Sequence, residues 1–154
     1  MLTILVDTRE QTPWEFPLAK VKKQKLIAGD YSIFGKTTEI VIERKTASDL
    51  FHTLTRGGDR FAAEMQRLRA VRYRAVVVEA NQEQIKNGVW SSGANGPRVL
   101  DHFLRVCMQW GAAPVFCRGP QEAQDTAWRM LRGWHELSMR GAGGGGGGDP
   151  EGAP

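Results

Sequence analysis

Cysteine is scarce in this sequence, and long apolar runs are missing. The two cysteines, Cys107 and Cys117, have neither CxxC nor Cys/His spacing, which argues against structural zinc and leaves buried free thiols as the simplest expectation. No stretch approaches the roughly 18 apolar residues of a membrane-spanning helix, and the N-terminus lacks the features of a signal peptide. We therefore expect a protein of the reducing cytoplasm with no membrane partner.

Charge of one sign is limited as well. The formal net charge is only +4, which is compatible with an anionic partner such as nucleic acid but does not require one. A hydrophobic fraction of 41% is ordinary for a globular chain and suffices for the core of one domain at 1–140. The glycine-rich residues 141–154 cannot bury enough apolar surface to order themselves, so we predict a disordered tail there.

The most informative stretch is an apolar run that ends in charged residues. The β-branched residues 40–42 predict a buried strand that continues into Glu43, Arg44 and Lys45. Strand alternation places Glu43 and Lys45 on one face and Arg44 on the other. A buried carboxylate and ammonium are costly to desolvate unless they have partners. Either Glu43 ligates a divalent cation while Lys45 acts on a water or phosphate, or the strand runs into a solvated, salt-bridged end.

A hairpin can bring a second acid beside Glu43. Asp30 precedes a predicted strand, and a turn at Gly35-Lys36 would pair that strand with residues 40–45. Two carboxylates from adjacent strands, together with Lys45, make an oxygen-rich site of the kind that binds Mg²⁺ or Mn²⁺.

In chain order, the charged blocks form a longer pattern. A first strand at 2–6 runs into Val-Asp-Thr-Arg-Glu, and Gly-Asp, Glu-Arg-Lys and a further Asp follow. This resembles the nuclease domain of the XPF family of structure-specific endonucleases, with its pattern GD…ERKxxxD preceded by (V/I)DxRE. Every charged position of that pattern is filled, at Asp7, Arg9, Glu10, Asp30, Glu43, Arg44, Lys45 and Asp49. Several ordered blocks are far more specific than one short motif.

The resemblance implies metal-dependent hydrolysis of DNA phosphodiester bonds, with Mg²⁺ or Mn²⁺ as cofactor. Asp30 and Glu43 would ligate the metal, and Lys45 would orient the attacking water or bind the phosphate. Asp7 and Glu10 would support a second metal or hydrogen-bond the waters of the first. The implied catalytic set is therefore Asp7, Glu10, Asp30, Glu43 and Lys45, with Asp7 also a candidate ligand.

Supporting roles follow from the same resemblance. Arg9 and Arg44 could grip phosphate or lock the acids, and the carbonyl of Arg44 would complete the protein contacts of the metal. Asp49 could cap a helix, hold Lys45 or Arg44, or do both.

A second resemblance concerns the helix predicted after residue 59. Its Asp-Arg-Phe-x-x-Glu-x-x-Arg-Leu sequence is similar to that of small stand-alone bacterial and phage members, which implies roles for Arg60 and Glu64 near the site. A surface ion pair between these two residues is the open alternative. For DNA contact, with a merely solvated face as the alternative, the candidates are Arg9, Lys22, Lys23, Arg60 and Arg67.

The substrate implied by the family is branched or flapped DNA, but the 154 residues contain no helicase region and no tandem helix-hairpin-helix module. A homodimer or a protein partner could supply the missing grip. Two other functions stay open: a non-catalytic DNA-binding or scaffold subunit, and a restriction or mobile-element nuclease with the same core. All the acids and Lys45 are present, which favours activity.

The predicted elements suggest an α/β fold. They alternate to give a mixed central sheet of about five strands flanked by helices, in agreement with the restriction-endonuclease-like (PD-(D/E)XK) core that the resemblance implies. We expect Ser48 or Asp49 to begin one helix and Asp59 the next, with a loop at Thr55–Asp59 between them. Trp14 is expected to pack its loop down, with stacking on a nucleobase as the alternative. Glu79 ends an apolar strand and is expected to be a capping or solvated acid, with a place at the edge of the site as the alternative.

Overall fold

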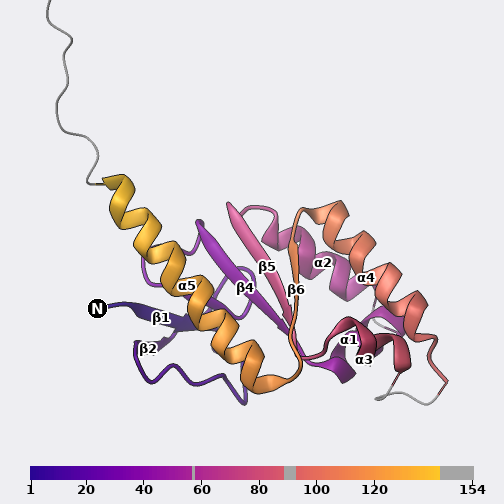
Figure 1. The fold of residues 1–154 in the computed structure, drawn as a ribbon. Coiled ribbons are helices and arrows are strands. Elements are labelled where there is room, and N and C mark those ends of the chain that lie inside the picture. The colour runs from indigo at the N-terminus through magenta and orange to yellow at the C-terminus, as the bar shows by residue number, and fades with distance from the viewer. Residues whose placement is uncertain (57, 89–92, 143–154) are drawn as a thin grey trace, which may run out of the picture.

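The computed structural model describes residues 1–56, 58–88 and 93–142, which form a mixed six-stranded sheet flanked by helices (Figure 1). The strands are β1 (Thr3–Val6), β2 (Lys20–Lys23), β3 (Tyr31–Ile33), β4 (Ile40–Lys45), β5 (Tyr73–Val78) and β6 (Ala113–Phe116). The helices are α1 (Ala47–Arg56), α2 (Gly58–Leu68), α3 (Gln82–Asn87), α4 (Gly96–Trp110) and α5 (Pro120–Ala142). The predicted α/β class, with a mixed sheet flanked by helices, is confirmed.

The order of strands across the sheet is β2-β1-β3-β4-β5-β6. β3 runs antiparallel to both of its neighbours, β1 and β4, whereas β5 is parallel to β4 and to β6. The parallel neighbours are joined by helical crossovers, α1 and α2 before β5 and α3 and α4 after it. As a result, the carboxyl ends of β1, β4 and β5 and the start of β3 lie along the same side of the sheet, where the strands end.

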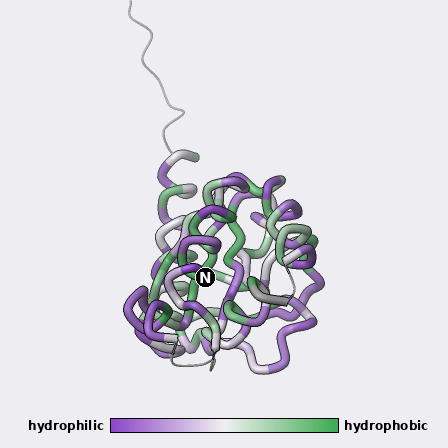
Figure 2. The backbone as a smooth tube through the Cα atoms, turned by 90° about the vertical axis from the view of Figure 1, so that its right-hand side faces the viewer, coloured by the Kyte–Doolittle hydropathy of each residue, from purple (hydrophilic) through white to green (hydrophobic). Residues whose placement is uncertain are grey.

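Because successive side chains of the central strands point to opposite faces of the sheet, they pack into two hydrophobic cores, one on each face. Val41, Val76 and Val78 pack with residues of α1 to α4 on one face of the sheet. Ile42 and Val77 pack with residues of α5 on the other face. Figure 1 shows α5 crossing its face of the sheet alone, with the other helices gathered on the far side, and Figure 2 shows green, hydrophobic segments in the interior. Burial on both faces explains why β4 and β5 read as continuous apolar runs.

The sheet has one strand more than the predicted number of about five, and the additional strand is β2. Its sequence, Lys-Val-Lys-Lys, lacks an alternation of buried apolar residues, and all its side chains are exposed. The strand forms because its backbone pairs in parallel with β1 at the edge of the sheet. Lysine is a common residue on edge strands, since its charge discourages pairing with another chain.

Two of the predicted helix starts are wrong. The N-cap of α1 is Thr46, whose hydroxyl accepts a hydrogen bond from the amide of Asp49 at 3.1 Å, so neither Ser48 nor Asp49 is the cap. α2 begins at Gly58, so Asp59 lies within its first turn. Because α1 extends to Arg56, the predicted five-residue loop is absent from the described residues, which leave out only residue 57 there.

Other predictions concern the ends of the chain and the two thiols. α5 continues to Ala142, so its last two residues belong to a helix and not to the predicted tail. Residues 143–154, the rest of the predicted tail, lie outside the described residues. Cys107 and Cys117 are buried and free, as predicted. No described helix combines the length and apolar character needed to cross a membrane.

Candidate active site

The charged blocks of the sequence converge on the side of the sheet where β1, β4 and β5 end. Asp7 follows β1, Asp30 precedes β3, residues 43–45 end β4, and Glu79 follows β5. The strand directions bring these positions to the same edge even though they are far apart in the chain. In sheets with parallel strands, the edge at which those strands end is the usual place for a functional site.

Asp30 and Glu43 lie opposite each other across the β3–β4 pair. The register joins Tyr31 to Ile42, so the residue before Tyr31 faces the residue after Ile42. The amide of Asp30 donates to the carbonyl of Ile42 at 2.9 Å, and the amide of Arg44 donates to Asp30 Oδ2 at 2.8 Å. The backbone ladder therefore holds the two carboxylates side by side.

Both carboxylates line a cavity of about 130 Å³, which we call the catalytic pocket. Its other charged lining residues are Arg9, Arg60, Glu64 and Arg67. The lining therefore combines three arginines with three acids, so cationic groups that can meet an anionic substrate surround the carboxylates.

Burial makes the two acids of the pocket hard to ionise. Burial raises the pKa of Asp30 to about 7, even though the hydrogen bond from the Arg44 amide acts in the opposite direction. Burial, followed by the negative charge of Asp30, raises the pKa of Glu43 well above its ordinary value. Two desolvated carboxylates that repel each other are strongly stabilised by a cation placed between them.

Lys45 reaches the same group of acids from the end of β4. Its Nζ lies 3.8 Å from Glu43 Oε1 and 3.5 Å from Glu64 Oε2, and it sits 5.0 Å from the centre of the Phe61 ring. Glu64 Oε1 is also 3.5 Å from Arg60 Nε, so the ion pair on α2 exists together with the contact to Lys45. The Arg60 side chain is 87% exposed and free to meet a partner in solution.

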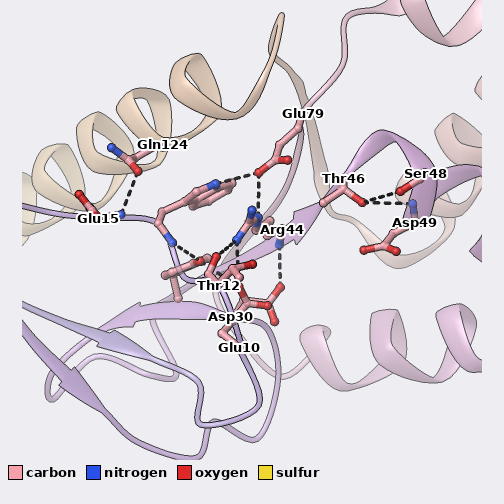
Figure 3. Close-up of polar contacts among 12 residues, drawn as sticks. Glu10, Thr12, Glu15, Asp30, Arg44, Thr46, Ser48, Asp49, Glu79 and Gln124 are labelled. Atoms are coloured by element: carbon pink, nitrogen blue, oxygen red, sulfur yellow. Dashed lines mark hydrogen bonds and ion pairs between the residues drawn. The ribbon is translucent and has the colours of Figure 1, made fainter. Parts of the chain in front are cut away.

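On the opposite face of β4, the side chain of Arg44 joins three segments of the chain (Figure 3). Its Nε donates to Glu79 Oε1 at 2.8 Å. Its Nη1 donates to Glu10 Oε2 at 3.2 Å and to the carbonyl of Thr12 at 2.6 Å. The guanidinium carbon lies 5.0 Å from the centre of the Trp14 ring. We call this set of contacts the Arg44 network.

The Arg44 network explains the roles of two more residues. The expectation of a capping or solvated acid at Glu79 is wrong. Glu79 is buried, with 9% of its surface exposed, and its Oε1 also accepts a hydrogen bond from Trp14 Nε1 at 2.8 Å. Trp14 packs its loop down, as predicted, and stacks on Tyr31 with ring centres 4.8 Å apart. Glu10 Oε2 accepts from Arg44 and from the Tyr31 hydroxyl at 3.0 Å, so Glu10 belongs to the Arg44 network, and its negative charge helps to raise the pKa of Asp30.

Asp7 has a local set of partners. One oxygen accepts from the amide and Nε of Arg9, and the other accepts from Arg9 Nη2 and from the amide of Leu26 at 2.7 Å. Burial raises the pKa of Asp7, but these hydrogen bonds outweigh that effect and hold it below its ordinary value. The structure therefore places Asp7 beside Arg9 and Leu26, outside the lining of the catalytic pocket.

The remaining predicted residues lie around this centre. Arg67 lines the pocket from α2, whereas Lys22 and Lys23 are exposed on β2, where Lys23 pairs with the last residue of β1. Asp49 lines a neighbouring cavity with Lys45. Among the contacts of the described residues, the partners of Lys45 are Glu43 and Glu64, and Asp49 is not one of them.

For two acids the sequence left the role open, and the structure shows their partners. Glu64 was linked to the site by resemblance alone, and it contacts Lys45 because α2 packs over the end of β4. Glu79 had one usable signal: it ends an apolar strand, and the parallel neighbour of such a strand ends at the same edge.

The described residues contain no group of three or more His, Cys, Asp or Glu side chains placed to hold a metal ion. Asp30 and Glu43 nevertheless supply two adjacent carboxylates of raised pKa. Mg²⁺ commonly binds through one or two carboxylates and keeps several waters. The donor set therefore fits a hard, hydrated cation.

Comparison with known proteins adds independent evidence. The family model described as the ERCC4 domain matches residues 6–128, which include every charged block discussed above. The chain belongs to the ERCC4 domain family. Its membership confirms the resemblance to XPF-type nucleases that the sequence pattern indicated.

Solved structures agree with this assignment of the ERCC4 domain. XPF from Aeropyrum pernix has a TM-score of 0.65 and 19% identity, over 99% of this chain and 67% of that chain. A second structure of XPF from Aeropyrum pernix, in complex with DNA, has a TM-score of 0.64 and 19% identity, over 91% of this chain and 66% of that chain. At this identity the likeness establishes a shared fold. No curated protein gave a significant match.

Proposed function

We propose that this ERCC4 domain is a Mg²⁺- or Mn²⁺-dependent DNA endonuclease that prefers flapped, forked or otherwise branched DNA. One observation carries the proposal: Asp30 and Glu43 line a single pocket together with three arginines, and Lys45 lies 3.8 Å from Glu43. Membership of the ERCC4 domain family supports the same reaction class. A scaffold subunit would have no need to keep two carboxylates of raised pKa side by side.

The protein groups that would hold the metal are Asp30, Glu43 and the backbone carbonyl of Arg44. A bound divalent cation supplies a Lewis acid for the phosphate and lowers the pKa of a coordinated water. The amide of Arg44 fixes Asp30 Oδ2, so the main chain of β4 orients that carboxylate.

The protein's own cations would handle the substrate. Lys45, held between Glu43 and Glu64, is placed to bind a non-bridging oxygen or orient the attacking water. The exposed guanidinium groups of Arg9, Arg60 and Arg67 line the pocket and can donate to neighbouring phosphates. Such contacts read the backbone of DNA and not its bases, which favours selection by shape. A second copy of the chain or a protein partner would extend this grip.

The decisive experiment is cleavage of labelled 3′-flap, splayed-fork, nicked and plain duplex DNA in Mg²⁺, Mn²⁺ or EDTA. We expect metal-dependent cutting close to the branch point. Glu43→Ala should abolish cleavage and largely spare DNA binding, because it removes a ligand and no phosphate contact. The free energy of unfolding of Glu43→Ala without metal should rise slightly, since the mutation relieves repulsion between two buried acids.

The matched control is Asp101→Ala, which removes an exposed acid from α4 and should cut like the wild type. Normal cleavage by both Glu43→Ala and Asp30→Ala would refute the metal-site assignment. If the wild type binds branched DNA without cutting it in any metal, the protein is a scaffold subunit.

A further inference from the structure

Ile27 is an apolar side chain exposed at the mouth of the catalytic pocket. It is 85% exposed, whereas its neighbours Leu26 and Ala28 are 3% and 6% exposed. It lines the catalytic pocket and also a second cavity of about 220 Å³ on the other side of the same segment. An isoleucine in this position contacts whatever enters either cavity.

The exposure of Ile27 is enforced by the backbone on which it sits. Asp7, which is 1% exposed, accepts a hydrogen bond from the amide of Leu26 at 2.7 Å, and Arg9 Nη2 donates to the carbonyl of Leu26 at 3.3 Å. With Leu26 and Ala28 packed inward, the intervening side chain must point outward. A buried carboxylate and an arginine thus hold the Ile27 segment rigidly beside the pocket.

The second cavity is lined by both apolar and positively charged side chains. Leu26, Ala28 and Val71 provide a buried apolar wall, and Lys25 and Arg67 add two exposed cations. Ile27, Ala28 and Arg67 also line the catalytic pocket, so the two cavities adjoin. An apolar wall beside cations is complementary to a nucleotide, which has an apolar base face and an anionic phosphate.

We propose that the second cavity binds the unpaired nucleotide next to the cleaved phosphodiester. Ile27 packs against its base and separates it from the duplex, and Lys25 and Arg67 contact its phosphates. Apolar side chains act in this way when proteins unstack DNA bases. The inference rests on the proposed function and deepens it, because it assigns the preference for branched DNA to one residue and one cavity of this domain.

Two variants test the inference in the full chain. Ile27→Ser removes the apolar contact and should weaken binding to a splayed fork about tenfold, the loss expected for exposing one buried isoleucine. Ala70→Trp fills the second cavity from its exposed rim and should have a similar effect. Binding to plain duplex should stay within about twofold of the wild type, because duplex offers no unpaired base.

Each variant has a matched control. Leu18→Ser removes another exposed apolar side chain, 74% exposed, that lines neither cavity. Ala142→Trp adds the same bulk at an exposed position of α5 that lines neither cavity. Both controls should bind fork and duplex like the wild type.

The probe is a fluorescent splayed fork, intact or with one abasic site moved along the unpaired strand, measured by anisotropy in EDTA and by cleavage in Mg²⁺. We expect an abasic site beside the branch to weaken binding by the wild type and not by Ala70→Trp. If the wild type cuts forks but Ile27→Ser and the abasic sites change neither binding nor cutting, the subsite is refuted and the nuclease assignment stands. If binding depends on the base but no metal supports cutting, the subsite stands and the proposed activity fails. Absence of fork binding by the wild type overturns both.

Discussion

Arg44 illustrates how one residue serves both faces of the sheet. Its amide donates to Asp30 Oδ2, and its side chain donates to Glu10 and Glu79 on the other side. The main chain of β4 therefore orients an acid of the catalytic pocket, while the Arg44 network holds that strand end in place. Glu79 is central to this arrangement, because one of its oxygens accepts from both Trp14 and Arg44.

At this scale we predict that Glu79→Ala lowers the free energy of unfolding by about 3 kcal/mol, because it leaves a partly buried guanidinium and an indole N–H without their acceptor. Cleavage of branched DNA should also fall, since the end of β4 loses the ion pair that holds Arg44 in place. Urea unfolding measures the first effect. The control is Glu83→Ala, whose side chain is 73% exposed and pairs with Lys86 on the same helix. A loss for Glu79→Ala no larger than that of the control would contradict the structural role of the network.

The β3–β4 hairpin shows how an element positions the site through its packing. Gly29 precedes Asp30 with a φ of +74°, and a Cβ there would lie 1.9 Å from Val41 Cγ1. The backbone can approach β4 this closely only because residue 29 has no side chain. This close approach allows the amide of Asp30 to bond to Ile42.

At the scale of the element, Gly29→Ala should destabilise the protein by at least about 3 kcal/mol, through an unfavourable φ and a clash with a strand. It should also displace Asp30 and reduce cleavage. Gly35→Ala separates the two causes, because Gly35 has a φ of +77° with nothing within 4 Å of the added Cβ. It should cost only about 1 kcal/mol, the penalty for the left-handed conformation alone. Equal losses of unfolding free energy for the two variants would show that the close approach is unimportant.

For the whole molecule, the distribution of charge is more informative than its total. The net charge is only +4, yet three arginines line the catalytic pocket, and Lys23 ends the strand that pairs with β1 at the same edge. Four basic residues therefore lie where the carboxyl ends of the strands meet, interspersed with the acids of the site. Such clustering, and not the formal charge, sets the affinity for a polyanion.

At this scale we predict that affinity for DNA falls steeply with salt and that the slope depends on individual cations. Lys23→Ala and Arg67→Ala should each reduce the slope of log K against log salt by about 1, because each removes one phosphate contact. Lys86→Ala on α3 is the control and should leave the slope unchanged, since Lys86 already pairs with Glu83. Anisotropy titrations across a salt series give the slopes. Identical slopes for all variants would show that DNA binds to another face of the molecule.

Much of the fold was predictable because it depends on short-range periodicity. The first strand at 2–6 and the strand at 40–45 agree with the structure, since backbone geometry alone sets their apolar spacing. β2 was missed because an edge strand of lysines has no such spacing and forms only by pairing with β1. The N-cap at Thr46 differs from the predicted Ser48 or Asp49 by two or three residues, because helix ends are the least predictable part of an element.

The amino-acid sequence alone was sufficient to indicate the family of the chain and the chemical character of its site. The charged blocks identify the acids and the lysine, and the alternation of side chains along a strand separates Arg44 from Glu43 and Lys45. Only the folded chain shows which groups are neighbours: Glu79 with Arg44, Glu64 with Lys45, and Asp7 with the backbone amide of Leu26. The physical reason is that periodicity arises within a segment, whereas the partners of a side chain depend on the strand order, register and helix packing of the assembled molecule.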